Sequence, residues 1–170
     1  MKTLSVITAL FVALAAPTLA RAERIAATLS GYEEVPVVST LASGEFRAMI
    51  DRDDQNIDYE LTYSGLQGTV LQAHIHVAQL SVNGSIVIWL CGTATNPGPA
   101  GTQACPQSGT ITGTIAAANV IAGATASQQL TAGDLAEVIA AIRVGVAYVN
   151  VHTNLSPGGE IRGQTRASRR

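Results

Sequence analysis

Three histidines are the residues of this chain whose types and spacing could do chemistry. His74 and His76 stand two positions apart, and His152 comes much later, in a segment that also holds Tyr148 and Asn150. Side chains at positions i and i+2 of a β-strand share a face, so each segment would present its polar side chains together if both are strands. Three neutral imidazoles with an open fourth position are a recurrent site for zinc or copper.

Two interpretations of these histidines stay open at the level of sequence. If the two strands are neighbours, the three imidazoles converge, and the pattern predicts a site for one copper or zinc ion. Otherwise they form a structural polar cluster, half-buried and hydrogen-bonded to a peptide group or a carboxylate. A two-residue turn at Asn83-Gly84 would place His76 opposite Cys91, on a partly apolar face, which favours the second interpretation.

Asn150, Glu160 and Arg162 are candidates for supporting the histidines. Residues 157–159 are Pro-Gly-Gly, a turn sequence, and Glu160 and Arg162 stand two positions apart in the segment that follows. A buried Glu160–Arg162 pair could brace the histidine face. Alternatively, both side chains could simply be solvated.

The elements that must position these residues are predicted as about eight short strands and one helix. The helix has Thr131 as its N-cap, apolar residues at helical spacing from Leu135 to Ile142, and Gly145 at its end. An acidic stretch between the second and third strands is predicted to be an exposed turn, because it lacks the ligand order of an EF-hand calcium loop. The pattern is typical of an all-β sandwich or flattened barrel in a single domain. The predicted strands are residues 24–30, 43–51, 57–63, 72–79, 85–91, 110–115, 145–153 and 160–165.

Residues 1–22 have the pattern of a cleavable signal peptide. Lys2 precedes an apolar run over residues 4–16, Pro17 breaks the run, and Ala20-Arg21-Ala22 fits the small-x-small cleavage pattern. The run is too short to cross a bilayer, which needs about 20 apolar residues. The sequence therefore predicts a secreted or periplasmic protein with no membrane span after cleavage.

An oxidising compartment bears on how the two cysteines are interpreted. Cys91 and Cys105 flank a Gly- and Pro-rich segment, and we expect one disulfide that closes this loop, with free thiols or metal ligands as the alternatives.

The net charge of −2, with 13% charged residues, gives no global attraction for nucleic acid. Since Lys2 is the single lysine, the exported chain would have none for Schiff-base or P-loop chemistry.

Several motifs, in order, resemble the CHRD domain family. The family is named after chordin, a secreted antagonist of bone morphogenetic proteins, and it occurs in many exported bacterial proteins. The motifs that carry the resemblance are Glu33-Glu34-Val35-Pro36-Val37, Ala73-His74-Ile75-His76, Tyr148-Val149-Asn150-Val151-His152-Thr153 and Pro157-Gly158-Gly159-Glu160-Ile161-Arg162-Gly163-Gln164.

The resemblance implies an immunoglobulin-like Greek-key β-barrel, distantly similar to the copper–zinc superoxide dismutases. It implies no catalytic residue and no agreed activity. The resemblance implies a CHRD domain at 23–166. The residues outside it are expected to be the signal peptide at 1–22 and a disordered tail at 167–170.

Two functions are consistent with this family. The first is a non-enzymatic extracytoplasmic module that binds or assembles with other surface molecules, as a homo-oligomer or with an extracellular protein partner; sparse charge and sheet edges favour it. The second is a mononuclear copper or zinc protein that uses His74, His76 and His152. Full dismutase chemistry is not expected, because a copper–zinc centre of that family needs six histidines and an aspartate, and the chain has 3 histidines.

Overall fold

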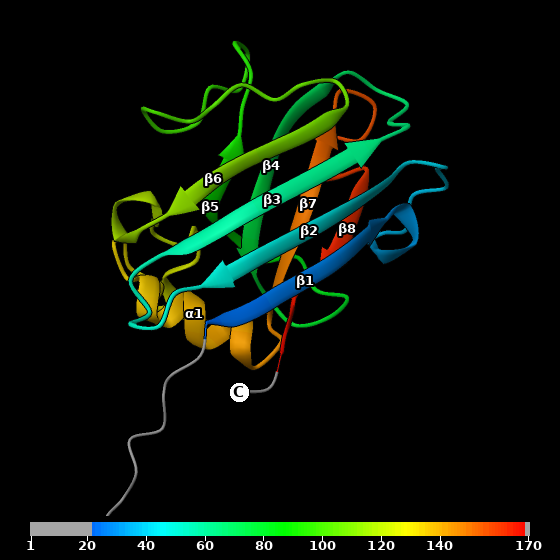
Figure 1. Ribbon diagram of the computed structural model, residues 1–170. Helices are drawn as coiled ribbons and strands as arrows, with labels where there is room; N and C mark the ends of the chain where they lie inside the picture. The colour runs from blue at the N-terminus through cyan, green and yellow to red at the C-terminus, as the bar shows by residue number, and fades with distance from the viewer. Residues whose placement is uncertain (1–21, 169–170) are drawn as a thin grey trace, which may run out of the picture.

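The structure is a computed structural model that describes residues 22–168, in which an antiparallel sheet curls into a nearly closed barrel (Figure 1). The order across the sheet is β5-β4-β7-β8-β1-β2-β3-β6, and β9 pairs with β1. The predicted all-β fold with one short helix is confirmed. The strands are β1 (Glu23–Ser30), β2 (Ser43–Ile50), β3 (Ile57–Ser64), β4 (Val70–Val77), β5 (Ser85–Cys91), β6 (Gly109–Ile115), β7 (Ala147–Thr153), β8 (Ile161–Gln164) and β9 (Arg166–Ala167).

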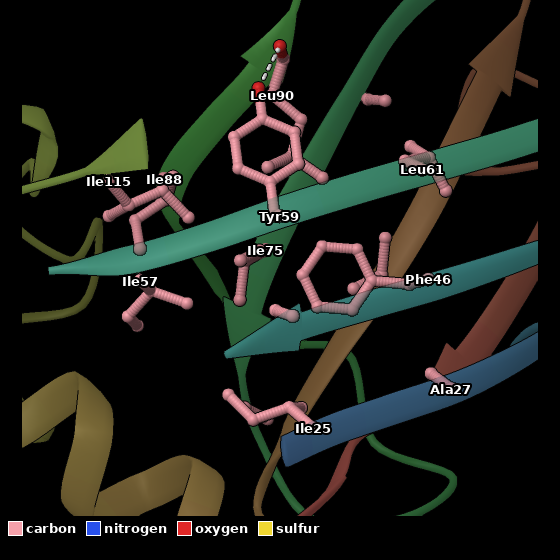
Figure 2. Packing of buried hydrophobic residues seen from close by; sticks show 14 of the residues in the cluster. Ile25, Ala27, Phe46, Ile57, Tyr59, Leu61, Ile75, Ile88, Leu90 and Ile115 are labelled. Carbon is pink, nitrogen blue, oxygen red and sulfur yellow. Dashed lines mark hydrogen bonds between the residues drawn. The ribbon is translucent and has the colours of Figure 1, made fainter. Parts of the chain in front are cut away.

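The core fills the inside of the barrel because the strands alternate apolar and polar residues. In β1 and β3, buried and exposed side chains alternate along the strand, as expected where one face of a sheet packs on a core. Figure 2 shows Phe46, Leu61, Ile75 and Ile88 meeting in this interior from different strands. Complete burial of one such side chain contributes roughly 1.5–3 kcal/mol, so the core holds the strands in register.

The two edge strands, β5 and β6, are joined through side chains and loops rather than by a ladder of their own. The Tyr59 hydroxyl on β3 donates to the Leu90 carbonyl on β5 at 3.1 Å (Figure 2) and accepts from Gln103 at 2.7 Å. Residues Ile88 and Val120 also form an isolated bridge. These contacts occupy part of the two sheet edges that could otherwise pair with a second copy of the chain. Self-association stays a prediction.

The predicted disulfide between Cys91 and Cys105 is confirmed. Cys91 is the last residue of β5 and is fully buried, and Cys105 lies in the loop that leads to β6. The bond closes a loop with a sequence separation of 14 and fastens it at the seam between the edge strands.

The single α-helix of the described residues, α1 (Leu135–Arg143), packs its predicted apolar face on the core, but its N-cap is Asp134 and not Thr131. Gly133, at φ +85°, turns the chain between these two residues, so the helix cannot begin at Thr131. The Asp134 carboxylate accepts from the Glu137 amide at 3.2 Å, and Gly145 follows the helix with φ +76°, as predicted.

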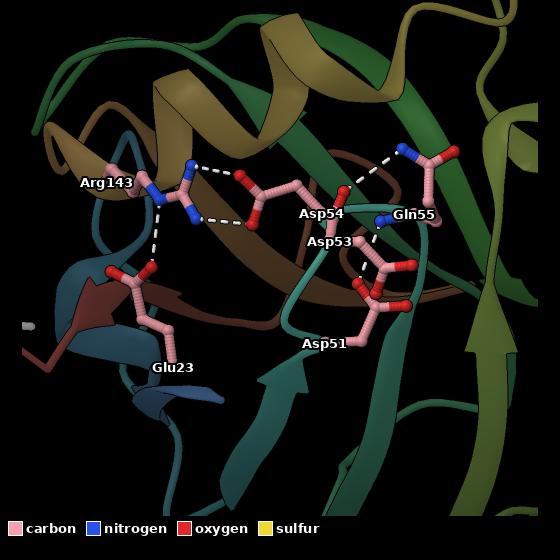
Figure 3. Close-up of polar contacts among 6 residues, drawn as sticks. All are labelled: Glu23, Asp51, Asp53, Asp54, Gln55 and Arg143. Carbon is pink, nitrogen blue, oxygen red and sulfur yellow. Dashed lines mark hydrogen bonds and ion pairs between the residues drawn. The ribbon is translucent and has the colours of Figure 1, made fainter. Parts of the chain in front are cut away.

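An ion cluster fixes the other end of α1 to the sheet (Figure 3). The Arg143 guanidinium donates to both carboxylate oxygens of Asp54 at 2.7 and 2.8 Å and to Glu23 at 2.8 Å. Asp51 accepts from the Gln55 amide at 2.8 Å inside the turn between β2 and β3. Of the acidic residues in this turn, Asp51 therefore bonds within the turn and Asp54 belongs to the ion cluster.

The turn between β4 and β5 differs from the prediction. The chain reverses at residues 79–82, where Ser81 has φ +60° and the Val82 amide donates to the Gln79 carbonyl at 3.1 Å. Register shifts also interrupt the β4–β5 pairing, so His76 lies opposite Ile86 rather than Cys91.

The ends of the chain are only partly described. Residues 1–21, which hold nearly all of the predicted signal peptide, lie outside the described residues, as do 169–170. Ala167, which the sequence placed in a disordered tail, belongs to β9 and pairs with Ile25 of β1. The Ser168 amide donates to the Arg24 carbonyl at 2.7 Å. None of the helices between residues 22 and 168 has the length and apolar character that crossing a bilayer requires.

Breaking the disulfide should weaken the barrel without unfolding it. For a closed loop of about 15 residues, the chain-entropy model gives roughly 3 kcal/mol, which corresponds to a fall in Tm of roughly 6–12 °C for a domain of this size. Thermal melts of the oxidised protein, the reduced protein and a Cys91→Ala/Cys105→Ala variant measure the loss. A reduced protein that is already unfolded at room temperature, and so shows no cooperative transition on heating, would contradict this expectation.

Candidate metal centre

The pairing of β4 with β7 brings the three histidines together. His74 lies opposite Asn150, His76 opposite Tyr148, and Gln72 opposite His152. Ala73 and Ile75 alternate with the first two histidines and point into the core, so the imidazoles occupy the outer face of the barrel wall. The strand adjacency on which the sequence hypothesis depended is therefore present.

The spacing of the imidazole nitrogens suits one ion. One nitrogen from each ring can be chosen so that all three lie within 4.8 Å of one another, and His74 Nδ1 is 3.2 Å from His152 Nε2. Two nitrogens bonded to one zinc ion at about 2.0–2.1 Å lie at most about 4.2 Å apart, and three nitrogens spread evenly around it lie roughly 3.6 Å apart. The widest pair of the cluster therefore has to close by up to roughly 1.2 Å when an ion binds. The 3.2 Å contact between His74 Nδ1 and His152 Nε2 is a hydrogen bond between the two rings.

Backbone carbonyls fix which nitrogens are free. His76 donates its Nδ1–H to the Gly84 carbonyl at 3.0 Å, and His152 donates its Nδ1–H to the Pro157 carbonyl at 2.9 Å. A neutral imidazole has one N–H, so Nε2 of both rings carries a lone pair. This second hydrogen bond to a carbonyl is the usual way in which a metal-binding histidine is oriented.

Two of the imidazole nitrogens are buried without a partner. Nε2 of His74 and Nε2 of His76 have no hydrogen-bond partner, although the side chains are 0% and 5% exposed. Buried polar atoms are nearly always paired, because an unpaired one costs roughly 1–3 kcal/mol. A bound ion would remove this cost, so the residues present fit a metal.

Burial keeps all three rings neutral. It lowers the pKa of His74 to about 2, with added repulsion from the two other histidines, and the pKa of His76 to about 4. The pKa of His152 is lowered for the same reason, in spite of its hydrogen bond to Pro157. Neutral imidazoles are the form that binds a metal, so no proton has to be removed first at neutral pH.

Aromatic rings and one guanidinium pack around the histidines. Trp89 meets His74 edge-on, with ring centroids 4.2 Å apart, and Tyr148 stacks on His76 at 4.6 Å. The Arg162 guanidinium carbon lies 3.4 Å from the centroid of the Tyr148 ring, a cation–π contact. These side chains exclude water from the cluster and fix its ring planes.

Asn150 and Arg162, named from the sequence as possible supports of the histidines, both lie near them, and their supporting role stays a prediction. Asn150 Oδ1 is 2.9 Å from His152 Nε2. Arg162 is 1% exposed and donates to the Val82 carbonyl at 3.0 Å and to Asn83 Oδ1 at 3.3 Å, so it holds the β4–β5 loop over the site.

Glu160 is buried but does not pair with Arg162 in the structure. Its two carboxylate oxygens accept from Thr40, Thr153 and the amides of Gln67 and Gly68. Thr153 follows His152 and therefore points to the opposite face of β7. Both predictions for this pair, a Glu–Arg brace and a solvated pair, were wrong.

Glu34 is a site residue that the sequence did not single out. It is 4% exposed, its Oε1 has no hydrogen-bond partner, and burial raises its pKa to about 7, against the opposing effect of Arg162. Gly159 lies directly against this carboxyl group, with φ +128°. Both residues belong to motifs of the family resemblance, which was the one available signal.

Over residues 22–168, the three histidines form the one group of three or more His, Cys, Asp or Glu side chains close enough to share an ion. The model of the CHRD domain matches residues 25–165, and the chain therefore belongs to the CHRD domain family. No curated protein and no solved structure matches the chain significantly.

Substitution of Gly159 should be far more damaging than substitution of its neighbour. A Cβ at Gly159 would overlap Glu34 Oε1, and its positive φ strains any L side chain, so we expect Gly159→Ala to cost roughly 2–4 kcal/mol. Gly158→Ala is the matched control, since nothing lies within 4 Å of its added Cβ, and should change stability by less than about 0.5 kcal/mol. Urea unfolding measures both, and equal losses would contradict the assigned contact.

The metal-free protein should lose stability as the pH falls from about 6.5 to 4. Unfolded histidines take up a proton near pH 6.5, whereas the folded chain keeps His74 and His76 neutral, so each of these two contributes roughly 1.4 kcal/mol per pH unit. The lowered pKa of His152 acts in the same direction. Glu34 acts in the opposite sense between about pH 4.5 and 7, because its folded carboxyl group holds a proton that the unfolded one has lost. We therefore expect a net slope of at least about one proton.

Urea melts at pH 7, 6 and 5 in the presence of a chelator test this slope. A His76→Gln variant should lose about one proton, or roughly 1.4 kcal/mol per pH unit, from it. A wild-type stability that is flat over this range would show that the rings are not held neutral.

Proposed function

We propose that this protein is an exported, non-enzymatic CHRD-domain module that binds a single copper or zinc ion through His74, His76 and His152. The observation that carries the proposal is the pair of buried Nε2 atoms, on His74 and His76, that have no hydrogen-bond partner. They belong to a cluster whose chosen ring nitrogens lie within 4.8 Å of one another.

The unpaired nitrogens favour this function over a purely structural cluster. A structural histidine normally uses both ring nitrogens in hydrogen bonds when it is buried. Here His76 uses Nδ1 on the Gly84 carbonyl and leaves Nε2 unpaired, and Nε2 of His74 is unpaired as well. His152 uses both nitrogens, Nδ1 on the Pro157 carbonyl and Nε2 on His74 Nδ1 and Asn150 Oδ1. The ion, when bound, would supply a positive charge on which the three lone pairs converge.

The remaining residues of the site orient and shield these ligands. The carbonyls of Gly84 and Pro157 hold two of the rings, and Trp89 and Tyr148 exclude water from them. Arg162 fastens the β4–β5 loop as a cover.

The CHRD family and the Cys91–Cys105 disulfide are both consistent with an extracytoplasmic location. Export by a signal peptide supports the proposal and stays a prediction, because residues 1–21 are outside the described part. Association with another protein or with a second copy also stays a prediction.

Metal titration of the purified protein tests the proposal. Trp89 is the single tryptophan and lies against His74, so binding of Cu(II) should quench its fluorescence with a stoichiometry of one ion per chain. His74→Ala and His152→Ala should each weaken copper and zinc binding by at least about tenfold, since even loss of an outer-shell contact costs that much. Glu60→Gln, an exposed carboxylate on β3, is the control for weak surface binding and should change nothing. Unchanged binding in both histidine variants would remove these residues from the site.

A further inference from the structure

We infer that the histidine centre selects monovalent copper, Cu(I), over divalent copper and zinc. The inference rests on the proposed function and narrows the choice of bound ion from copper or zinc to Cu(I). Three features of the described residues carry it: a ligand set without negative charge, the burial of that set, and a guanidinium next to it.

The ligand set brings no negative charge to the ion. The group that can share an ion consists of three histidines and includes no Asp or Glu. The outer partners of His76 and His152 are backbone carbonyls, where other metal sites use carboxylates. Any ion at this centre therefore keeps its full charge.

Burial makes that full charge expensive for a divalent ion. The three histidines are between 0% and 5% exposed, and the aromatic rings cover them. The cost of moving an ion from water into a medium of low dielectric constant rises with the square of its charge, so it is about four times larger for a divalent ion than for a monovalent one of equal size. A centre of neutral ligands has no anion with which to offset that cost.

Neither of the two buried acids near the centre belongs to the group that can share an ion. Glu34 interacts with Arg162 and with the Asn150 side chain. Glu160 accepts hydrogen bonds from Thr40, Thr153 and two backbone amides.

Arg162 adds to the preference. Its guanidinium carbon lies 3.4 Å from the centroid of the Tyr148 ring, which stacks on His76, so a positive charge stands one ring away from the centre. This charge repels a bound ion, and the repulsion is twice as large for a divalent ion.

The number of ligands points in the same direction. Zinc is almost always four-coordinate, and its three-histidine sites keep a fourth position open for water. The burial of this centre limits access of a fourth ligand from solvent. Cu(I), which carries a single charge, accepts three nitrogen ligands without a fourth.

Dissociation constants of the oxidised, full-length folded domain for the three ions test the inference. Cu(I) is titrated without oxygen, under ascorbate, against a chromophoric Cu(I) chelator, and Cu(II) and Zn(II) are titrated against their own competing chelators. We expect the dissociation constant for Cu(I) to be at least about 100-fold lower than that for either divalent ion. A divalent ion that binds as tightly as Cu(I) would overturn the inference and leave the proposed metal function standing. Failure of all three ions to bind would overturn both.

An isosteric variant tests the charge argument by itself. Asn150→Asp puts a carboxylate oxygen where Oδ1 now lies, 2.9 Å from His152 Nε2. It should reduce the preference for Cu(I) over Zn(II) by at least about tenfold. The control is Asn119→Asp, because Asn119 is exposed and its oxygen only accepts from the Ala116 amide. If the ratio of the dissociation constants for Zn(II) and Cu(I) is unchanged in a folded Asn150→Asp protein, the charge argument is contradicted. If that variant does not fold, the same ratio in the wild-type protein decides alone.

Discussion

The antiparallel pairing of β4 with β7 is the constraint on which the rest of the structure depends. Its register places His74 opposite Asn150 and His76 opposite Tyr148. A slip by one residue would turn every side chain of one strand to the other face. Ile75 and Val149, paired in this ladder, are fully buried in the core, so a slip would expose them at roughly 1.5–3 kcal/mol each. Hydrophobic burial on the inside of the barrel therefore fixes the geometry of the imidazoles on the outside.

Local patterns in the sequence predicted much of the fold. Alternation located most of the strands, and helical spacing located α1, because both depend on residues close in the chain. The error at Asn83-Gly84 shows the limit of such patterns. This pair is typical of a two-residue turn, but the Asn83 side chain donates through Nδ2 to the Val35 carbonyl, and the Gly84 carbonyl accepts from His76. Here long-range contacts, and not turn geometry, account for the two residues.

The candidate site could be predicted only in part. The spacing of His74 and His76 indicated a shared face, but their meeting with His152 depends on a pairing across 78 positions that no local pattern specifies. The carbonyls that orient the rings belong to Gly84 and Pro157, and a backbone group has no signature in the sequence. Glu34 illustrates a third limit, because a glutamate in a motif does not reveal that its carboxyl group will be buried.

Core and polar cluster lie on opposite sides of the same strands. Ala73, Ile75 and Val149 point inward, whereas His74, His76 and Asn150 point outward. The outer layer can therefore accept substitutions with little effect on the packing of the core. In the course of evolution, relatives could lose, retune or replace the outer chemistry while the same barrel persisted. A shared scaffold in this family is thus compatible with divergent biochemical roles.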